Sequence, residues 1–143
     1  RALVAYLRSI PAIASAQPAT LAPPAPSSPK EGGAVGGALG KQVFEQACAG
    51  CHGWTGVSAI SPYATISGTR AVNDPTATNV AQIVISGTRR VTPPGIVSMP
   101  AFGDIYSDAE IAAVANYLTG RFGGAASKLS ARDVVELRSQ TAR

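Results

Sequence analysis

Apolar residues recur at helical spacing in the last third of the chain. Five of them share one helical face: Ile111, Val114, Ala115, Leu118 and Phe122. The preceding Ser107-Asp108-Ala109-Glu110 has the S-x-x-E form of a capping box. Gly123-Gly124 follows, and glycine commonly ends a helix. The pattern therefore predicts an amphipathic helix from about Ser107 to Phe122.

An earlier segment has a similar period, built around a glycine and an aromatic residue. Gly40, Phe44 and Cys48 lie four residues apart, so they share one face of a helix that begins near Ala38. A glycine and an aromatic on one face suit a helix that another helix crosses closely. We expect the Val114–Tyr117 face of the later helix to be the partner.

Two shorter helices are predicted, with irregular segments between the elements. The first begins at Asn79 as N-cap, with Gln82 in the capping-box position, Val80, Ile83 and Val84 as its apolar face and Gly87 as C-cap. The second begins at Ser130 and has Leu129, Val134 and Leu137 as apolar residues, but the pattern assigns it no task. Segments 58–74 and 91–101 are interrupted by proline and glycine, which predicts irregular or extended chain.

The first 37 residues lack a core-forming pattern. Residues 11–37 are rich in Pro, Ala and Gly, with six of the eleven prolines between Pro11 and Pro29, which indicates a linker. Residues 1–10 are typical of the end of an amphipathic helix. One interpretation is the remainder of a signal peptide, with Ala14-Ser15-Ala16 as a small-residue cleavage site. We favour the closing helix of a preceding similar domain, because Val4–Leu7 repeats the pattern of Val114–Leu118.

Composition excludes some function classes. A chain of 143 residues has room for about one domain with extensions. Its net charge of +4 is mild and no dense Lys/Arg cluster occurs, so nucleic-acid binding is not expected. No uninterrupted apolar stretch of about 18 residues is present to span a membrane.

The chemistry of the chain centres on Cys48-Ala49-Gly50-Cys51-His52. This Cys-x-x-Cys-His pattern is typical of c-type haem attachment. The two thiols add across the haem vinyl groups, and the next residue becomes an axial iron ligand. Both cysteines of the chain and its only histidine are used here. A thioredoxin-like dithiol would follow a strand and would not need His52, and no strand-rich run precedes Cys48.

A haem iron bound by one histidine has a sixth position, which a residue outside this pattern can fill. Met99 is the only methionine and lies among prolines 93, 94 and 100, which hold its loop extended. A lone methionine is usually a core residue. The other candidates for the sixth position are Lys41, Lys128, water or nothing. A thioether on a stiff loop is the best of these, so we predict His52 and Met99 as iron ligands.

Three further expectations concern the surroundings of the haem. The ring N–H of His52 should donate to a backbone carbonyl between Pro62 and Thr65. Arg89 or Arg90 either pairs with a haem propionate or forms a solvated pair at a helix end, with equal support. Trp54 either walls the haem edge or is an ordinary core residue.

Together these residues resemble a class I cytochrome c domain from about Ala38 to Gly124. The matching features are Gly40/Phe44, Cys48 to His52, Met99-Pro100 and Val114/Tyr117. More narrowly, the segments around Asn79–Arg90, Met99–Gly103 and Ala115–Gly123 are similar to the last haem domain of multihaem cytochrome subunits of membrane-associated bacterial dehydrogenases. Those enzymes oxidise alcohols, aldehydes, sugars or related compounds. One departure is Ala64, where the family usually has a proline whose carbonyl accepts the histidine N–H.

The resemblance implies an all-α cytochrome c fold, with helices wrapped around one covalent haem c and the N- and C-terminal helices crossing. The haem domain would be residues 38–124, and residues 125–143 a tail with a short helix. The cofactor-binding residues would be Cys48, Cys51, His52 and Met99, with the last two as metal ligands.

The implied function is one-electron transfer rather than catalysis, within a periplasmic respiratory chain. A dehydrogenase catalytic subunit would be the electron donor, and a quinone or another cytochrome or oxidase the acceptor. Preceding haem domains would belong to the same parent chain, and inner-membrane association would come from parts outside this sequence. Two alternatives remain: a haem sensor or haem enzyme with an open iron site, and a passive assembly module. A peroxidase is disfavoured, because with His52 as ligand no second histidine can act as a distal base.

Overall fold

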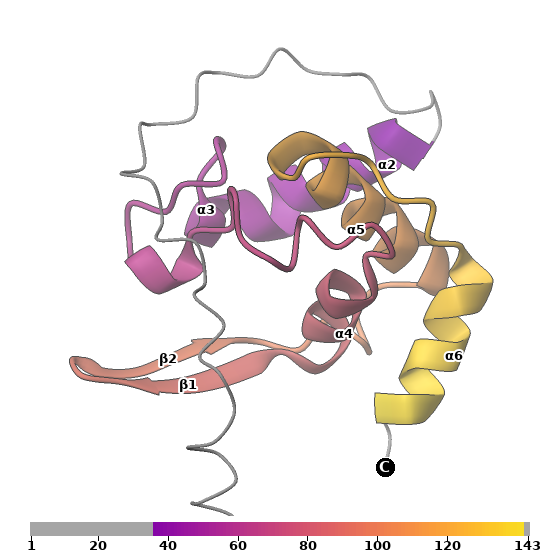
Figure 1. Cartoon of the computed structure of the whole chain (residues 1–143). Helices are drawn as coiled ribbons and strands as arrows, with labels where there is room; N and C mark the ends of the chain where they lie inside the picture. The colour runs from indigo at the N-terminus through magenta and orange to yellow at the C-terminus, as the bar shows by residue number, and fades with distance from the viewer. Residues whose placement is uncertain (1–35, 142–143) are drawn as a thin grey trace, which may run out of the picture.

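The computed structural model describes residues 36–141, and most of this part is helical (Figure 1). The elements in chain order are α2 (Gly36–Val43), the π-helix η1 (Phe44–Cys48), α3 (Ala49–His52), the 3-10 turn η2 (Pro62–Ala64), α4 (Thr78–Ser86), β1 (Thr88–Thr92), β2 (Gly95–Met99), α5 (Asp108–Phe122) and α6 (Ala131–Thr141). The helical prediction is confirmed, with one hairpin added. The expected helix at residues 1–10 and residues 11–35 of the linker expected at 11–37 lie outside the described residues; α2 already begins at Gly36.

Helices α2 and α5 cross at Gly40. A Cβ atom added there would lie 2.2 Å from the carbonyl oxygen of Ala113 and 2.7 Å from Cβ of Tyr117. Only glycine therefore lets the two backbones approach this closely. One turn later, the Phe44 ring lies 5.7 Å from the ring of Tyr117 and 5.2 Å from that of Phe122. The predicted crossing of the terminal helices of the haem domain is confirmed.

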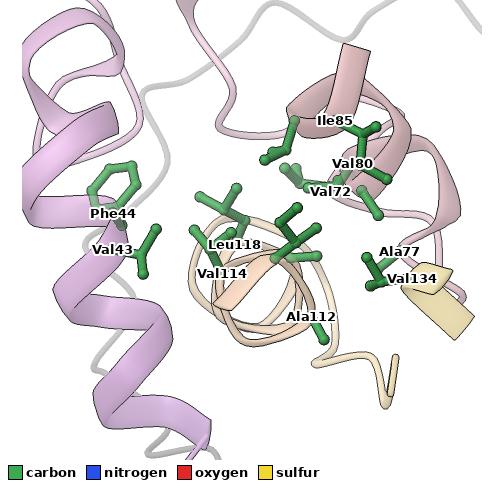
Figure 2. Packing of buried hydrophobic residues seen from close by; sticks show 14 of the residues in the cluster. Val43, Phe44, Val72, Ala77, Val80, Ile85, Ala112, Val114, Leu118 and Val134 are labelled. Carbon is green, nitrogen blue, oxygen red and sulfur yellow. The ribbon is translucent and has the colours of Figure 1, made fainter. Parts of the chain in front are cut away.

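Helix α5 is the centre of the hydrophobic core. Figure 2 looks along α5, with Val43 and Phe44 on one side and Val80 and Ile85 on the other. All five apolar residues predicted for this helix are buried. Its N-terminus has the predicted capping box, in which Ser107 and Glu110 bond reciprocally. The sequence pattern thus located both the start and the buried face of this helix correctly.

The predicted cap of α4 is wrong. The helix begins at Thr78 rather than Asn79, and its N-cap residue, Ala77, has a left-handed backbone and no side-chain cap. In the turn before the helix, the Asp74 carboxylate accepts hydrogen bonds from the amide and hydroxyl of Thr76. These bonds, and a smaller contribution from the Asn79 amide, lower the pKa of Asp74. The predicted C-cap, Gly87, is confirmed.

The segment predicted as an extended loop forms an antiparallel hairpin. Strand β1 pairs with β2 in a register that places Thr88 opposite Met99 and Thr92 opposite Gly95. Pro93 and Pro94 form the two-residue turn, where their missing N–H groups cost no ladder bond. The prolines do exclude a helix here, as predicted, but β-branched residues on both sides complete the two strands. Met99 is therefore the last residue of a strand.

Helix α6 packs against both α4 and α5 (Figure 1). Val134 and Leu137 are buried in the core, as the pattern predicted. The amide and hydroxyl of Ser130 donate to the Asp133 carboxylate at the start of the helix, which lowers the pKa of Asp133. Among the described helices, none is long and apolar enough to cross a bilayer.

Candidate functional site

The Cys-x-x-Cys-His residues lie where η1 passes into α3. Cys48 ends the π-helical turn and is half-buried, whereas Cys51 is exposed one helical turn later. The π-helix is rare and occurs mostly as single turns at functional sites. Phe44, four residues before Cys48, is 1% exposed and anchors this turn in the core. The core thus fixes the segment that carries both thiols.

The two thiols do not have the character of a redox dithiol. Burial, and then the neighbouring Cys51, raise the pKa of Cys48 to about 11. A thioredoxin-like cysteine is instead activated by a lowered pKa. Within residues 36–141, no strand comes before Thr88, so the strand expected ahead of such a motif is also missing.

His52 is oriented by a backbone carbonyl, as predicted. Its Nδ1 lies 2.6 Å from the carbonyl oxygen of Ala64 and donates to it. Ala64 occupies the position where the resembling family usually has a proline. The loop around Ala64 is instead restrained by Pro62, which begins the η2 turn, and by Ser61, whose side chain accepts a hydrogen bond from the Tyr63 amide. Because Nδ1 is used, Nε2 is left as the nitrogen for a metal.

Ser58, which no sequence motif singles out, also supports this region. Its hydroxyl donates to the carbonyl of Cys51 at 2.6 Å and accepts from the amides of Ile60 and Ser61. One side chain therefore ties the end of the haem motif to the loop that leads to Ala64. A serine in a polar loop gives no distinctive sequence signal, although its hydroxyl is well suited to such local bonds.

Met99 is half-buried and packs against the edge of the core. Its backbone lies against the end of α4, because a Cβ added at Gly87 would lie 2.5 Å from the Met99 carbonyl oxygen. The φ of +68° at Gly87 also favours glycine. Just beyond Met99, the amides of Phe102 and Gly103 donate to the last carbonyls of α4. The methionine position is therefore set largely by backbone contacts.

The hairpin register distinguishes the two arginines. Arg90 lies opposite Val97 and shares a face with Met99, whereas Arg89 lies opposite Ser98 on the other face. The guanidinium carbon of Arg90 lies 5.9 Å from the centre of the Tyr63 ring. Among the described residues, neither arginine has a carboxylate within salt-bridge distance.

The contact between Arg90 and Tyr63 joins the loop that holds His52 to the hairpin that carries Met99. Tyr63 adjoins Ala64, which holds His52, and Arg90 belongs to the hairpin that carries Met99. Figure 1 shows the hairpin and the loop after α3 on the same side of the molecule. Tyr106, in the segment after Met99, is partly buried against the same hydrophobic core as Cys48, and this burial raises the pKa of Tyr106.

The surroundings of His52 expose apolar surface. Trp54 is 65% exposed, so its interpretation as a core residue is wrong. Three more large apolar side chains are exposed in the next ten residues: Val57, Ile60 and Tyr63. Exposed apolar patches of this kind commonly mark a ligand or partner site.

A c-type haem fits this set of residues. Two adjacent free thiols can form its thioether bonds, and Nε2 of an oriented imidazole and a thioether are donors that haem iron accepts. A flat apolar macrocycle would also cover exposed apolar surface beside His52. Within residues 36–141, no three His, Cys, Asp or Glu side chains are grouped to hold a bare metal ion.

Comparisons with known proteins agree with this chemistry. The family model for cytochrome c matches residues 37–121. The gluconate 2-dehydrogenase cytochrome c subunit of Pantoea cypripedii is 35% identical over 108 residues, which cover 69% of this chain and 24% of that subunit. The chain thus spans about a quarter of the length of this relative.

Proposed function

The chain belongs to the cytochrome c family, and on this basis we propose that it transfers single electrons through a haem ligated by His52 and Met99. It is a cytochrome c electron carrier, and Cys48 and Cys51 imply one covalent haem c. The observation that best supports the ligand assignment is the bond from Nδ1 of His52 to the Ala64 carbonyl. A ring held in this way has Nε2 as its remaining donor.

The residues of the chain set the properties of the electron carrier. When bound, haem c supplies an iron that accepts and releases one electron. Cys48 and Cys51 attach the group, and Ala64 fixes the tautomer and orientation of His52. Met99 would complete the ligand set, and a Met/His pair raises the reduction potential. The exposed apolar residues beside His52 would keep water away from the haem once it covers them.

We assign propionate binding to Arg90 rather than Arg89. Arg90 shares the hairpin face of Met99 and reaches Tyr63 on the other side of the site. A guanidinium is a strong partner for a carboxylate. Arg89 lies on the opposite face and has the solvated role.

The proposed electron donor is the catalytic subunit of a dehydrogenase. The relative named above is the cytochrome subunit of gluconate 2-dehydrogenase, which supports a partner of this kind but does not identify its substrate. The acceptor would be a quinone or another cytochrome or oxidase, and further haem domains would precede this one in the parent chain. Haem attachment to the two cysteines suits the periplasm. Association with the inner membrane would come from parts of the parent protein outside this sequence.

Absorption spectra of the oxidised and reduced protein test the ligand set. We expect a low-spin c-type spectrum with the weak far-red band of a methionine–ferric iron bond. The variant Met99→Ala should lose that band, lower the reduction potential and let the ferrous protein bind carbon monoxide rapidly. An unchanged spectrum and potential in this variant would exclude Met99 as ligand, and rapid carbon monoxide binding by the wild type would favour the open-site alternative.

A further inference from the structure

Helix α6 lies beyond the residues that the cytochrome c family model matches. Its buried residues, Val134 and Leu137, attach it to the core. The next residue, Arg138, is half-buried and reaches a different part of the molecule. This side chain gives α6 a role that its apolar pattern does not indicate.

The guanidinium of Arg138 binds two carbonyls in the segment between Met99 and α5 and the carboxylate of Asp108, the first residue of α5. Nε lies 2.5 Å from Oδ1 of Asp108, and Nη2 donates to the carbonyl of Tyr106 at 2.8 Å. Nη1 donates to the carbonyl of Gly103. Gly103 is also tight against α4, because a Cβ there would lie 2.8 Å from the Ile85 carbonyl oxygen. The segment is thus held by α4 on one side and by Arg138 on the other.

We propose that Arg138 is a positioning residue that keeps Met99 on the haem iron, an inference that rests on the ligand set proposed above. Gly103 is only four residues beyond Met99. Without the guanidinium, the carbonyls of Gly103 and Tyr106 lose a charged donor, and hydrogen bonds to charged groups are the stronger ones. The segment then moves more freely, and Met99 leaves the iron more often.

Imidazole binding to the ferric protein measures this release, because an added nitrogen ligand can bind only after Met99 has left. We expect Arg138→Gln, in the full chain matured with haem, to bind imidazole roughly tenfold faster than wild type. Its far-red band should also fade at a lower temperature. The matched control is Arg132→Gln, because Arg132 is exposed on the same helix, and this variant should behave as wild type.

A purely structural role for Arg138 would lower the unfolding temperature without changing the imidazole rate measured well below it. That result would overturn the proposal. If Arg138→Gln does not accumulate as a haem protein, Arg138→Lys decides, because an ammonium can pair with Asp108 but lacks the planar fork that reaches both carbonyls. A faster imidazole rate in this variant supports the proposal, and the wild-type rate contradicts it.

The failure of the ligand assignment itself would look different. A wild-type protein without the far-red band would remove Met99 from the iron, and the role of Arg138 with it. A wild-type protein that shows the band, beside an Arg138→Gln variant with an unchanged imidazole rate, would overturn the role of Arg138 alone.

Discussion

The segment from Cys48 to His52 and the hairpin that carries Met99 are fixed by different kinds of contact. Cys48 ends the π-helical turn that begins at Phe44, and Phe44 is buried against the rings of Tyr117 and Phe122 in α5. The hairpin instead extends from the body of the protein, and its arginines are exposed (Figure 1). Its end lies against α4 through backbone contacts, and Arg138 binds the segment that follows, from Gly103 to Asp108.

This difference separates the stability of the domain from the ligation and reduction potential of the iron. The segment Cys48–His52, here called the histidine side, depends on core packing, so changes there should alter the stability of the whole domain. The hairpin β1–β2 with Met99 and the segment up to Asp108, here called the methionine side, depends on a few polar and backbone contacts. Regions held in this way open at lower free-energy cost. Changes there should alter the iron ligand and the potential before they unfold the chain.

The largest effect is expected from Gly40→Ala, which tests the histidine side. The new Cβ would lie 2.2 Å from the Ala113 carbonyl oxygen, so α2 must move away from α5. We expect a loss of about 3 kcal/mol in the free energy of unfolding, as for severe overpacking. Guanidinium denaturation followed by circular dichroism measures it.

The control is Gly50→Ala, inside the haem motif, where a Cβ would meet nothing within 4 Å. This variant should be as stable as wild type or slightly more so, since alanine favours helix. Equal stability of the two variants would show that the crossing of α2 and α5 does not carry the histidine side.

A smaller effect is expected from Arg90→Gln, which tests the methionine side. If Arg90 binds a propionate, its loss raises the pKa of that propionate by about 1 unit and lowers the reduction potential, because a cation near the iron favours the reduced form. Spectroelectrochemical titration over a range of pH measures both shifts. The free energy of unfolding should change little.

Arg89→Gln is the matched control, because it removes the same charge from the opposite face of the same strand. Arg89 lies on the hairpin face away from Met99, so its loss should shift the reduction potential less. If the two variants shift the potential equally, only net charge matters and the propionate assignment to Arg90 is wrong.

The sequence predicted the histidine side much better than the methionine side, for physical reasons. Core packing is periodic, so Gly40, Phe44 and the apolar residues of α5 could be identified from their spacing alone. The carbonyl that holds His52 was located to within four residues, and the structure identifies it as Ala64.

The contacts of the methionine side do not produce a periodic pattern in the sequence. The prolines of segment 91–101 indicated an extended loop without a helix, but not that the β-branched residues around Pro93-Pro94 pair as a hairpin. The choice between Arg89 and Arg90 needed the strand register, since adjacent residues face opposite ways. Arg138 lies 35 residues from Gly103, and no local pattern links two such positions.

The smallest effect is expected from Ser107→Ala, at the start of the helix that both sides share. The hydroxyl of Ser107 donates to the Glu110 carboxylate at 2.6 Å and is the main cause of the lowered pKa of Glu110. Loss of a serine N-cap costs about 1 kcal/mol, measured at pH 7 by thermal unfolding. The far-red band should not change, because Arg138 still holds the segment between Met99 and Asp108.

The pH dependence of this variant follows from the sign of the shift. A carboxylate whose pKa is lowered by folding stabilises the folded state above its unfolded pKa, and the effect is lost as the pH falls through the lower folded pKa. The stability difference between wild type and Ser107→Ala should therefore shrink below about pH 4, where Glu110 becomes protonated. Part of the difference should remain, since the Ser107 hydroxyl also accepts a hydrogen bond from the Glu110 amide. A difference that is constant from pH 7 to pH 3 would mean that the charge of Glu110 contributes nothing to this cap.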